Sequence, residues 1–165
     1  MPNYRRMRVQ GGTYFFTLRL ADPKSSALIE NMSLLRDAMR AEIRHHPFSL
    51  IETVILPNHL HAIWRLPEGD ADFSNRWRRI KSSVTRKVVQ SNSVSPSKKR
   101  KGEKGFWQRR FWEHSIRNDA ELAHYRAYCW INPVKHGLVA HAQDWPYSSY
   151  HRALRRGEID KDWQF

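Results

Sequence analysis

Residues 48–66 read FSLIETVILPNHLHAIWRL, and the prediction of the fold starts from this segment. Two runs rich in β-branched and aromatic side chains, Phe48–Leu56 and His59–Leu66, flank the dipeptide Pro57–Asn58. Such runs are typical of strands, and proline followed by asparagine is typical of a tight turn. The stretch therefore predicts two antiparallel strands joined by a short turn.

Strand and helix patterns continue on both sides of this hairpin. The same composition predicts two further strands, and apolar residues at helical spacing predict three helices. The predicted strands are Thr13–Arg19 and Phe111–Ile116, and the predicted helices run from Ser25 or Ser26 to about His45, over Phe73–Val89, and from Ala120 to about Ile131. We expect a serine to cap the first helix, Asp119 to cap the third, and Asn132-Pro133 to end the third.

The order of elements is strand, helix, strand, strand, helix, strand, helix. This order predicts an α+β fold, a ferredoxin-like antiparallel sheet with helices on one face, in a single domain over residues 1–165. A polar, Ser/Lys/Gly-rich segment at about 91–105 predicts a flexible basic loop. The aromatic tail from about residue 145 is expected to pack back on the domain.

Composition narrows the class of protein. The 165 residues include seven tryptophans and are 40% hydrophobic, which indicates a folded domain. No apolar run approaches the roughly 18–20 residues that span a bilayer, and the first residues lack a signal-peptide core. The single cysteine, Cys129, cannot form an internal disulfide, which fits a reducing cytoplasm.

Positive charge is concentrated in one part of the chain. The formal net charge is +13, and residues 76–110 hold thirteen Lys or Arg against one acidic residue, Glu103. A patch of this kind is typical of a protein that binds a phosphate backbone, although a solvated basic tail would show the same run. Interleaved tryptophans without an amphipathic stripe argue against a membrane surface.

The motif Pro57-Asn58-His59-Leu60-His61 carries the first candidate site. Residues i and i+2 of a strand point to the same face, so His59 and His61 are expected side by side. Two neighbouring imidazoles can bind one divalent metal, but histidines that merely decorate a strand would give the same pattern.

The third helix carries the second candidate site. Tyr128 and Asn132 are four residues apart and share a helix face, with Tyr125 one turn earlier. A tyrosine hydroxyl becomes a nucleophile when a metal or cation stabilises its oxyanion. Each residue also has an ordinary structural explanation, since tyrosines pack half-buried and asparagine before proline ends helices.

Four spaced motifs together resemble one family. PNHLHAIW, RRFWEHSIRN, YCWINPVKHGLV and WPYSSYHR, following an opening YRR…GGTYFFTLRL, resemble the REP-associated tyrosine transposases, which belong to the HUH single-tyrosine transposases. The resemblance extends to about Arg152. It implies that His59 and His61 are the metal-binding HUH histidines, that Tyr128 is the nucleophile and that Asn132 is a further metal ligand.

The resemblance also implies the reaction and the partner. The expected cofactor is Mg²⁺ or Mn²⁺, and the expected chemistry is nicking and rejoining of single-stranded DNA through a 5′-phosphotyrosine intermediate. The expected substrate is a repetitive extragenic palindrome folded as a hairpin, with a flanking tetranucleotide. It further implies a bacterial protein that works in the cytoplasm at the nucleoid, as a monomer, with a dimer as the alternative.

Positively charged and N-terminal residues are the candidates for DNA contact. They are Tyr4, Arg5, Arg6, Arg76, Arg78, Arg79, Lys81, Arg86, Lys87, Arg109 and Arg110. Two rival hypotheses remain: a module that binds nucleic-acid hairpins without cutting them, and a phosphodiesterase in which water replaces the tyrosine.

Overall fold

The predicted hairpin forms one side of a four-stranded antiparallel sheet in the computed structural model of the chain, which describes residues 6–91 and 105–165. The Leu56 N–H donates to the His59 carbonyl (2.8 Å) across the turn, and Ile55 pairs with Leu60. The strands follow the order β2-β3-β1-β4. Their bounds are β1 Thr13–Arg19, β2 Ser49–Ile55, β3 His59–Arg65 and β4 Trp112–Ile116, which confirms all four predicted strands.

The helices agree with the predicted order but differ at their ends. They are α1 Ala27–Glu30, α2 Met32–His45, α3 Phe73–Ser91, α5 Asp119–Lys135 and α6 Tyr150–Arg155, with a short 3₁₀ turn, η1, at Ala142–Asp144. The first predicted helix is two helices that meet at Asn31, whose backbone N–H (3.0 Å) and side chain (2.8 Å) both donate to the Ala27 carbonyl and close α1. Ser26 precedes α1 but makes no capping bond with its side chain.

The predicted end of the third helix at Asn132-Pro133 is wrong. α5 continues through Pro133 to Lys135, because the proline removes only one donor near the end of a helix that packs on the sheet. The helix stops at Gly137 (φ 68°), where Gly137 N–H donates to Val134 and Leu138 N–H to Pro133. Its N-cap is Asn118 rather than Asp119, since the Asn118 side chain accepts from the Glu121 N–H (2.8 Å).

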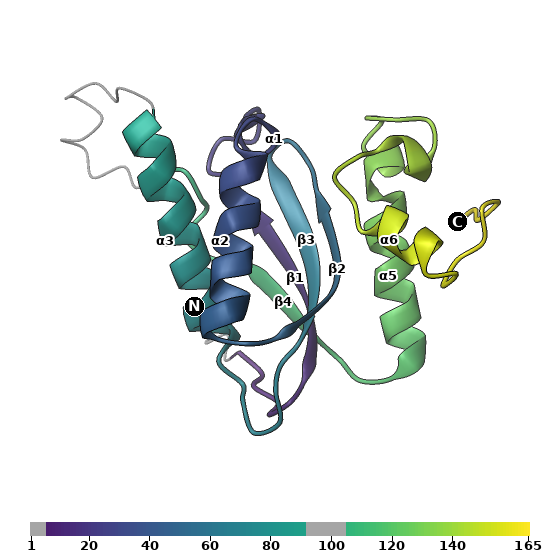
Figure 1. Cartoon of the computed structure of the whole chain (residues 1–165), viewed down its shortest axis with the longest axis horizontal. Helices are drawn as coiled ribbons and strands as arrows, with labels where there is room; N and C mark the ends of the chain where they lie inside the picture. The colour runs from purple at the N-terminus through teal and green to yellow at the C-terminus, as the bar shows by residue number, and fades with distance from the viewer. Residues whose placement is uncertain (1–5, 92–104) are drawn as a thin grey trace, which may run out of the picture.

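The α+β class is confirmed, and one detail is corrected: the helices cover both faces of the sheet (Figure 1). α2 and α3 cover one face, where Phe16, Leu60 and Trp64 belong to the main core cluster. α5 covers the other face, where Phe15 and Ile63 pack with its residue Cys129. Both faces of the sheet carry apolar side chains from β1 and β3, so each face needs a helix to exclude water from them.

The C-terminal segment packs on the outer side of α5. Trp163 lies edge-on to Trp130 of α5, with ring centroids 5.3 Å apart, and Tyr150 of α6 belongs to the same cluster. Nearly all of the basic loop expected at 91–105 lies outside the described residues. Within residues 6–91 and 105–165, no helix has the length and apolarity needed to cross a membrane.

Candidate active site

His59 and His61 project side by side from β3, as the strand pattern predicts. Their ring centroids are 5.2 Å apart, and each residue is only 3% exposed. The pair lies on the α5 face of the sheet, while the intervening Leu60 points into the core beneath α2 and α3. The strand therefore sets both imidazoles against α5 in a nearly water-free place.

Neighbouring side chains fix the orientation of both rings. The Nδ1 atom of His61 is 2.8 Å from Thr17 Oγ1, and the Nδ1 atom of His59 is 2.6 Å from Asn58 Oδ1. The Nε2 atoms of both rings are buried and have no hydrogen-bond partner in the described part of the chain. Because an Nδ1–H donated to Asn58 leaves the Nε2 lone pair of His59 free, this arrangement suits a metal ligand.

Both imidazoles are held in their neutral form. Burial is the main cause that lowers the pKa of His59 to about 4, and the charges of His136 and Arg19 act in the same direction. Burial also lowers the pKa of His61 to about 3, aided by the charges of His59 and Arg19. The rings are therefore unprotonated at pH 7, as metal binding requires.

Asn132 of α5 supplies a third candidate ligand. It is 1% exposed, and among the described residues neither its Oδ1 nor its Nδ2 atom has a hydrogen-bond partner. Against the larger effect of burial, its amide acts to raise the pKa of both His59 and His61, which places the amide beside the two rings. A buried amide without a partner is costly, and a cation bound by its oxygen and the two Nε2 atoms would satisfy all three groups.

The residues present therefore fit a divalent metal, although the candidate set includes no carboxylate or thiolate. Residues 6–91 and 105–165 contain no group of three or more His, Cys, Asp or Glu that could hold a metal ion. The candidate set consists instead of two imidazoles and one amide oxygen. Amide and imidazole donors suit first-row divalent ions such as Mn²⁺.

Tyr128 lies against His61. Its ring centroid is 5.3 Å from that of His61, edge-on at 70°, and the Lys135 Nζ atom is 4.9 Å from the centre of its ring. Tyr125 instead stacks on Phe15 at 4.5 Å, and its pKa is raised by burial and then by the charge of Glu121. A raised pKa disfavours the oxyanion of Tyr125, the form that a tyrosine nucleophile needs.

A buried carboxylate fixes α5 to the sheet. Glu52 of β2 is 1% exposed and accepts from Arg126 Nε (2.8 Å), from Trp130 Nε1 (3.1 Å) and from the Ser149 hydroxyl. Arg126 and Trp130 flank Tyr128 by two residues on either side. This network sets the height and rotation of the helix that carries Tyr128.

Several of these residues could not be assigned from the sequence. Thr17 reaches His61 only because β1 pairs with β3, and His136, whose ring is 4.9 Å from that of His59, follows the end of α5. Asn58 was expected only as a turn residue. A local pattern does not show which side chains meet across strands, so Thr17 and Glu52 carried no usable signal.

Comparison with known proteins places the chain in a family. No protein-family model matches it. A REP-associated tyrosine transposase of Escherichia coli strain K12 is 44% identical over 163 residues, which covers 99% of this chain and 91% of that protein. A protein of Haemophilus influenzae named for the same family is 40% identical over 164 residues, covering 99% and 93%.

A solved structure agrees with these relatives. The structure of a REP-associated tyrosine transposase bound to a REP hairpin matches with a TM-score of 0.88 at 44% identity, and covers 100% of this chain and 92% of that one. This chain belongs to the REP-associated tyrosine transposases. The predicted family and its fold are confirmed, and the chain is a tyrosine transposase.

The basic residues of this transposase fall into two groups. Some have structural partners: Arg76 is 5% exposed and bonds Asp70 and the His46, Pro47 and Asp72 carbonyls, and Arg79 binds Glu42 with two nitrogens. Arg6 lies over Phe111 and pairs with Glu113. These contacts do not favour a DNA role for Arg76, while Tyr4 and Arg5 lie outside the described residues.

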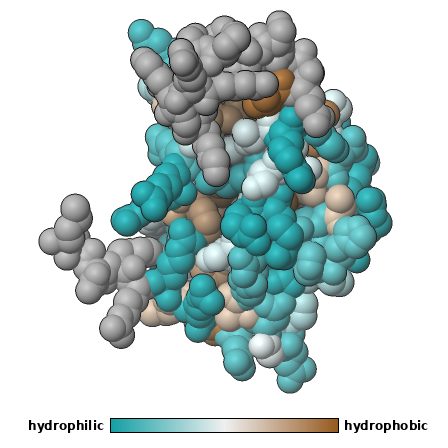
Figure 2. All heavy atoms as spheres, turned by 90° about the vertical axis from the view of Figure 1, so that its left-hand side faces the viewer, coloured by the Kyte–Doolittle hydropathy of each residue, from teal (hydrophilic) through white to brown (hydrophobic). Residues whose placement is uncertain are grey.

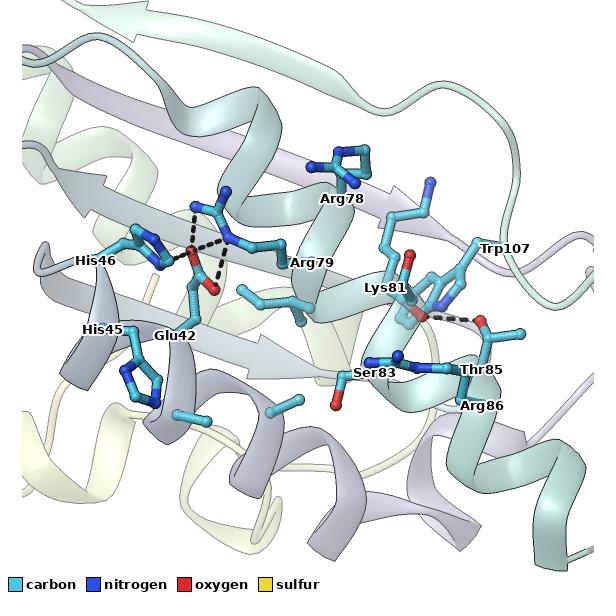
Figure 3. A pocket seen from close by; sticks show the side chains of 14 residues that line it. Glu42, His45, His46, Arg78, Arg79, Lys81, Ser83, Thr85, Arg86 and Trp107 are labelled. Carbon is cyan, nitrogen blue, oxygen red and sulfur yellow. Dashed lines mark hydrogen bonds and ion pairs between the residues drawn. The ribbon is translucent and has the colours of Figure 1, made fainter.

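The second group faces solvent, mainly along α3 of the transposase. Arg78, Arg86 and Lys87 are exposed on that helix, and Arg109 and Arg110 are exposed before β4. Figure 2 shows the α2 and α3 side of the molecule, where hydrophilic side chains predominate outside the grey atoms. A groove of about 900 Å³ runs between α2 and α3 and is lined by Arg78, Lys81 and Arg86 (Figure 3).

Proposed function

We propose that this transposase cuts and rejoins one DNA strand at the foot of a palindromic hairpin, with Tyr128 as nucleophile. The observation that carries the proposal is the convergence of Tyr128 with three buried, unpartnered donors: His59 Nε2, His61 Nε2 and the Asn132 amide. Groups of this kind have no use in a module that only binds hairpins.

The side chains of the site divide the chemistry between them. A Mg²⁺ or Mn²⁺ ion held by His59, His61 and Asn132 would polarise the scissile phosphate as a Lewis acid. Thr17 and Asn58 hold the two rings through the Nδ1 atoms of His61 and His59, which leaves both Nε2 atoms available to the metal. The Lys135 ammonium, close to the Tyr128 ring, stabilises negative charge that develops on the attacking oxygen.

The reaction is a transesterification. Tyr128 Oη attacks the phosphorus, the bond from phosphorus to the 3′-oxygen breaks, and the tyrosine proton ends on the released 3′-hydroxyl. The strand with the 5′-phosphate stays linked to Tyr128. Attack by a 3′-hydroxyl on that link restores the tyrosine and joins the strands, so the energy of the phosphodiester is conserved and no nucleotide cofactor is required.

The proposed substrate is a REP-type hairpin with a short unpaired flank. The similarity to a transposase bound to a REP hairpin supports this substrate, and so do the exposed cations of α3. Phosphates bind such cations with release of counterions, which makes binding sensitive to salt. Because the proposed substrate is DNA, we propose that the protein works at the nucleoid. We also propose that one chain holds one hairpin, because all the proposed site residues lie in a single chain.

The test is an incubation of end-labelled hairpin oligonucleotides with the protein and Mn²⁺, followed by a denaturing gel. The proposal expects a nicked strand and a protein–DNA adduct that survives denaturation. Nicking without an adduct would instead favour water as the nucleophile, and tight binding without nicking would favour a pure binding module. His59→Ala and His61→Ala should each abolish nicking while retaining hairpin binding.

A further inference from the structure

A small cleft adjoins the histidine pair on the side of β1 and β4. It has a volume of about 320 Å³ and is lined by Thr17, Arg19, Gln108, Arg110, Phe111 and Trp112. One lining residue, Thr17, is the residue that holds the His61 ring. The cleft therefore shares Thr17 with the candidate active site but contains none of its proposed ligands.

The sheet register fixes the distance between this cleft and the site. His61 pairs with Thr17 on β1, and Thr17 pairs with Trp112 on β4, so the three residues form one row across the sheet. Two strand spacings separate the ends of this row, or roughly 10 Å. Trp112 thus lies two strands away from His61 on the same row of the sheet.

Trp112 is held on one side and open on the other. Its ring stacks on His114 (6.0 Å, 12°) and meets Phe15 edge-on at 5.8 Å. It is nevertheless 49% exposed, which is unusual for a tryptophan on a strand. A fixed indole with a free face is the surface on which unpaired bases stack.

Two arginines border the same cleft. Arg19 pairs with His59 in the sheet, and Arg110 comes two residues before Trp112. Both are exposed, and neither forms an ion pair with an acidic side chain within the described parts of the chain. Guanidinium groups in this state bind phosphate oxygens strongly, often with two parallel hydrogen bonds.

We propose that this cleft is the binding subsite for one unpaired nucleotide next to the scissile phosphate. The base stacks on Trp112, and Arg19 and Arg110 bind the phosphate of that nucleotide. The inference rests on the proposed function, because it takes the attacked phosphate to lie at His59, His61 and Tyr128. It adds to that function the arginines Arg19 and Arg110 and the ring of Trp112, which together position the single-stranded flank.

The main alternative occupant is a second copy of the chain. β4 is an edge strand, and edge strands can pair between molecules. A second copy would bring a net charge of +13 towards two exposed arginines, which opposes that contact. The charge and the aromatic face together favour a nucleotide.

The experiment measures base stacking directly and does not require cleavage. Hairpins with 2-aminopurine at each position of the unpaired flank are bound to the full chain in a Tyr128→Phe background, where the strand stays intact. One position should show quenched fluorescence. Trp112→Leu should remove that quench and weaken binding of the flank by about 5- to 150-fold, the range for loss of one stacked base, whereas Trp112→Phe should retain most of both.

The arginines give a second, independent measurement. Arg19→Gln and Arg110→Gln should each weaken binding of the flanked hairpin but leave a blunt hairpin unaffected, and Arg36→Gln, an exposed arginine on α2, should change neither. Quenching that survives Trp112→Leu in a folded variant, or equal binding by the Arg110→Gln protein, would overturn the proposal. So would a shift in oligomeric state caused by Trp112→Leu, which would make the cleft a contact between chains.

These outcomes separate the subsite from the proposed reaction. If the wild-type protein fails to nick DNA but Trp112-dependent quenching persists, the nuclease proposal fails and the subsite remains. If nicking and adduct formation persist without any Trp112-dependent quenching, the subsite fails and the nuclease remains.

Discussion

The ring of Tyr128 stands edge-on to the ring of His61, with ring centroids 5.3 Å apart, and burial keeps this imidazole unprotonated by lowering its pKa to about 3. Tyr128→Phe removes the hydroxyl and keeps the ring contacts. It should lower nicking by about 10³-fold or more, as loss of a nucleophile does, and should eliminate the covalent adduct. A denaturing gel measures both.

Tyr125→Phe is the matched control. It lies one turn earlier on the same helix and stacks on Phe15 rather than on the histidines. Nicking by this variant should stay within a few-fold of wild type. An adduct that persists in Tyr128→Phe and disappears in Tyr125→Phe would move the nucleophile to Tyr125.

The Thr17 hydroxyl should matter for metal binding although it is not a proposed ligand. Thr17→Val keeps the shape of the side chain and deletes the oxygen that lies 2.8 Å from His61 Nδ1. Loss of such an orienting bond typically costs about 10- to 100-fold in metal affinity. Calorimetric titration with Mn²⁺ measures the effect, with Thr85→Val on α3 as the control; equal affinity for both variants would contradict it.

The low pKa values of His59 and His61 should make the metal-free protein lose stability in acid. Both pKa values are lower in the folded than in the unfolded chain, so the unfolded chain binds more protons between about pH 6.5 and 4. The free energy of unfolding should therefore be highest above pH 6.5 and fall below it, by at most about 1.4 kcal/mol per pH unit for each group.

Urea unfolding at several pH values tests this dependence in the presence of a chelator. His61→Gln should flatten the pH dependence, since it removes the most strongly shifted imidazole. His124→Gln, which changes an exposed histidine of α5, should leave the slope as it is. A wild-type protein equally stable at pH 7.5 and pH 5 would refute the argument.

Glu52→Gln should loosen the helix that carries the nucleophile. The substitution leaves the volume nearly unchanged but removes the charge that binds Arg126 and accepts from Trp130 and Ser149. We expect a loss of about 1–3 kcal/mol in the free energy of unfolding, typical of disturbed buried hydrogen bonds. Glu158→Gln removes the exposed partner of the same arginine and should cost less than about 1 kcal/mol.

The exposed cations of α3 should set the salt dependence of hairpin binding. Arg78→Gln, Arg86→Gln and Lys87→Gln combined should weaken binding at low salt, and each lost contact with duplex phosphate should reduce the slope of log K against log salt by about 0.9. Arg76 is left out because its contacts are structural. An unchanged slope, measured against Arg36→Gln by fluorescence anisotropy, would place the DNA elsewhere.

Much of the sheet was predictable because its signals are local. Pro57–Asn58 and the flanking β-branched residues indicate the hairpin, and the i, i+2 spacing alone places His59 and His61 on one face. The failures concern tertiary context. Pro133 stays inside α5 because the helix is anchored by packing, and nothing in the spacing of its residues told which face of the sheet α5 would cover.

The charged residues show the same limit. A run of arginines indicates affinity for phosphate, but Arg76 lies in that run and is buried among carbonyl oxygens. Whether an arginine is buried depends on which side of its helix faces the core, and a count of charges does not contain that information. The resemblance to a known family suggested Tyr128 and Asn132 as site residues, whereas Thr17, Glu52 and Trp112 required the register of the strands.

The division of the apolar core into two clusters, one on each face of the sheet, separates two kinds of evolutionary change. The side chains on the outer surface of α3 contact neither Phe15 nor Cys129, so they can vary without moving the histidines or Tyr128. Under the proposed function, a lineage could adapt to the hairpins of its own genome through the α3 layer, while the layer that holds the histidines and Tyr128 stays unchanged.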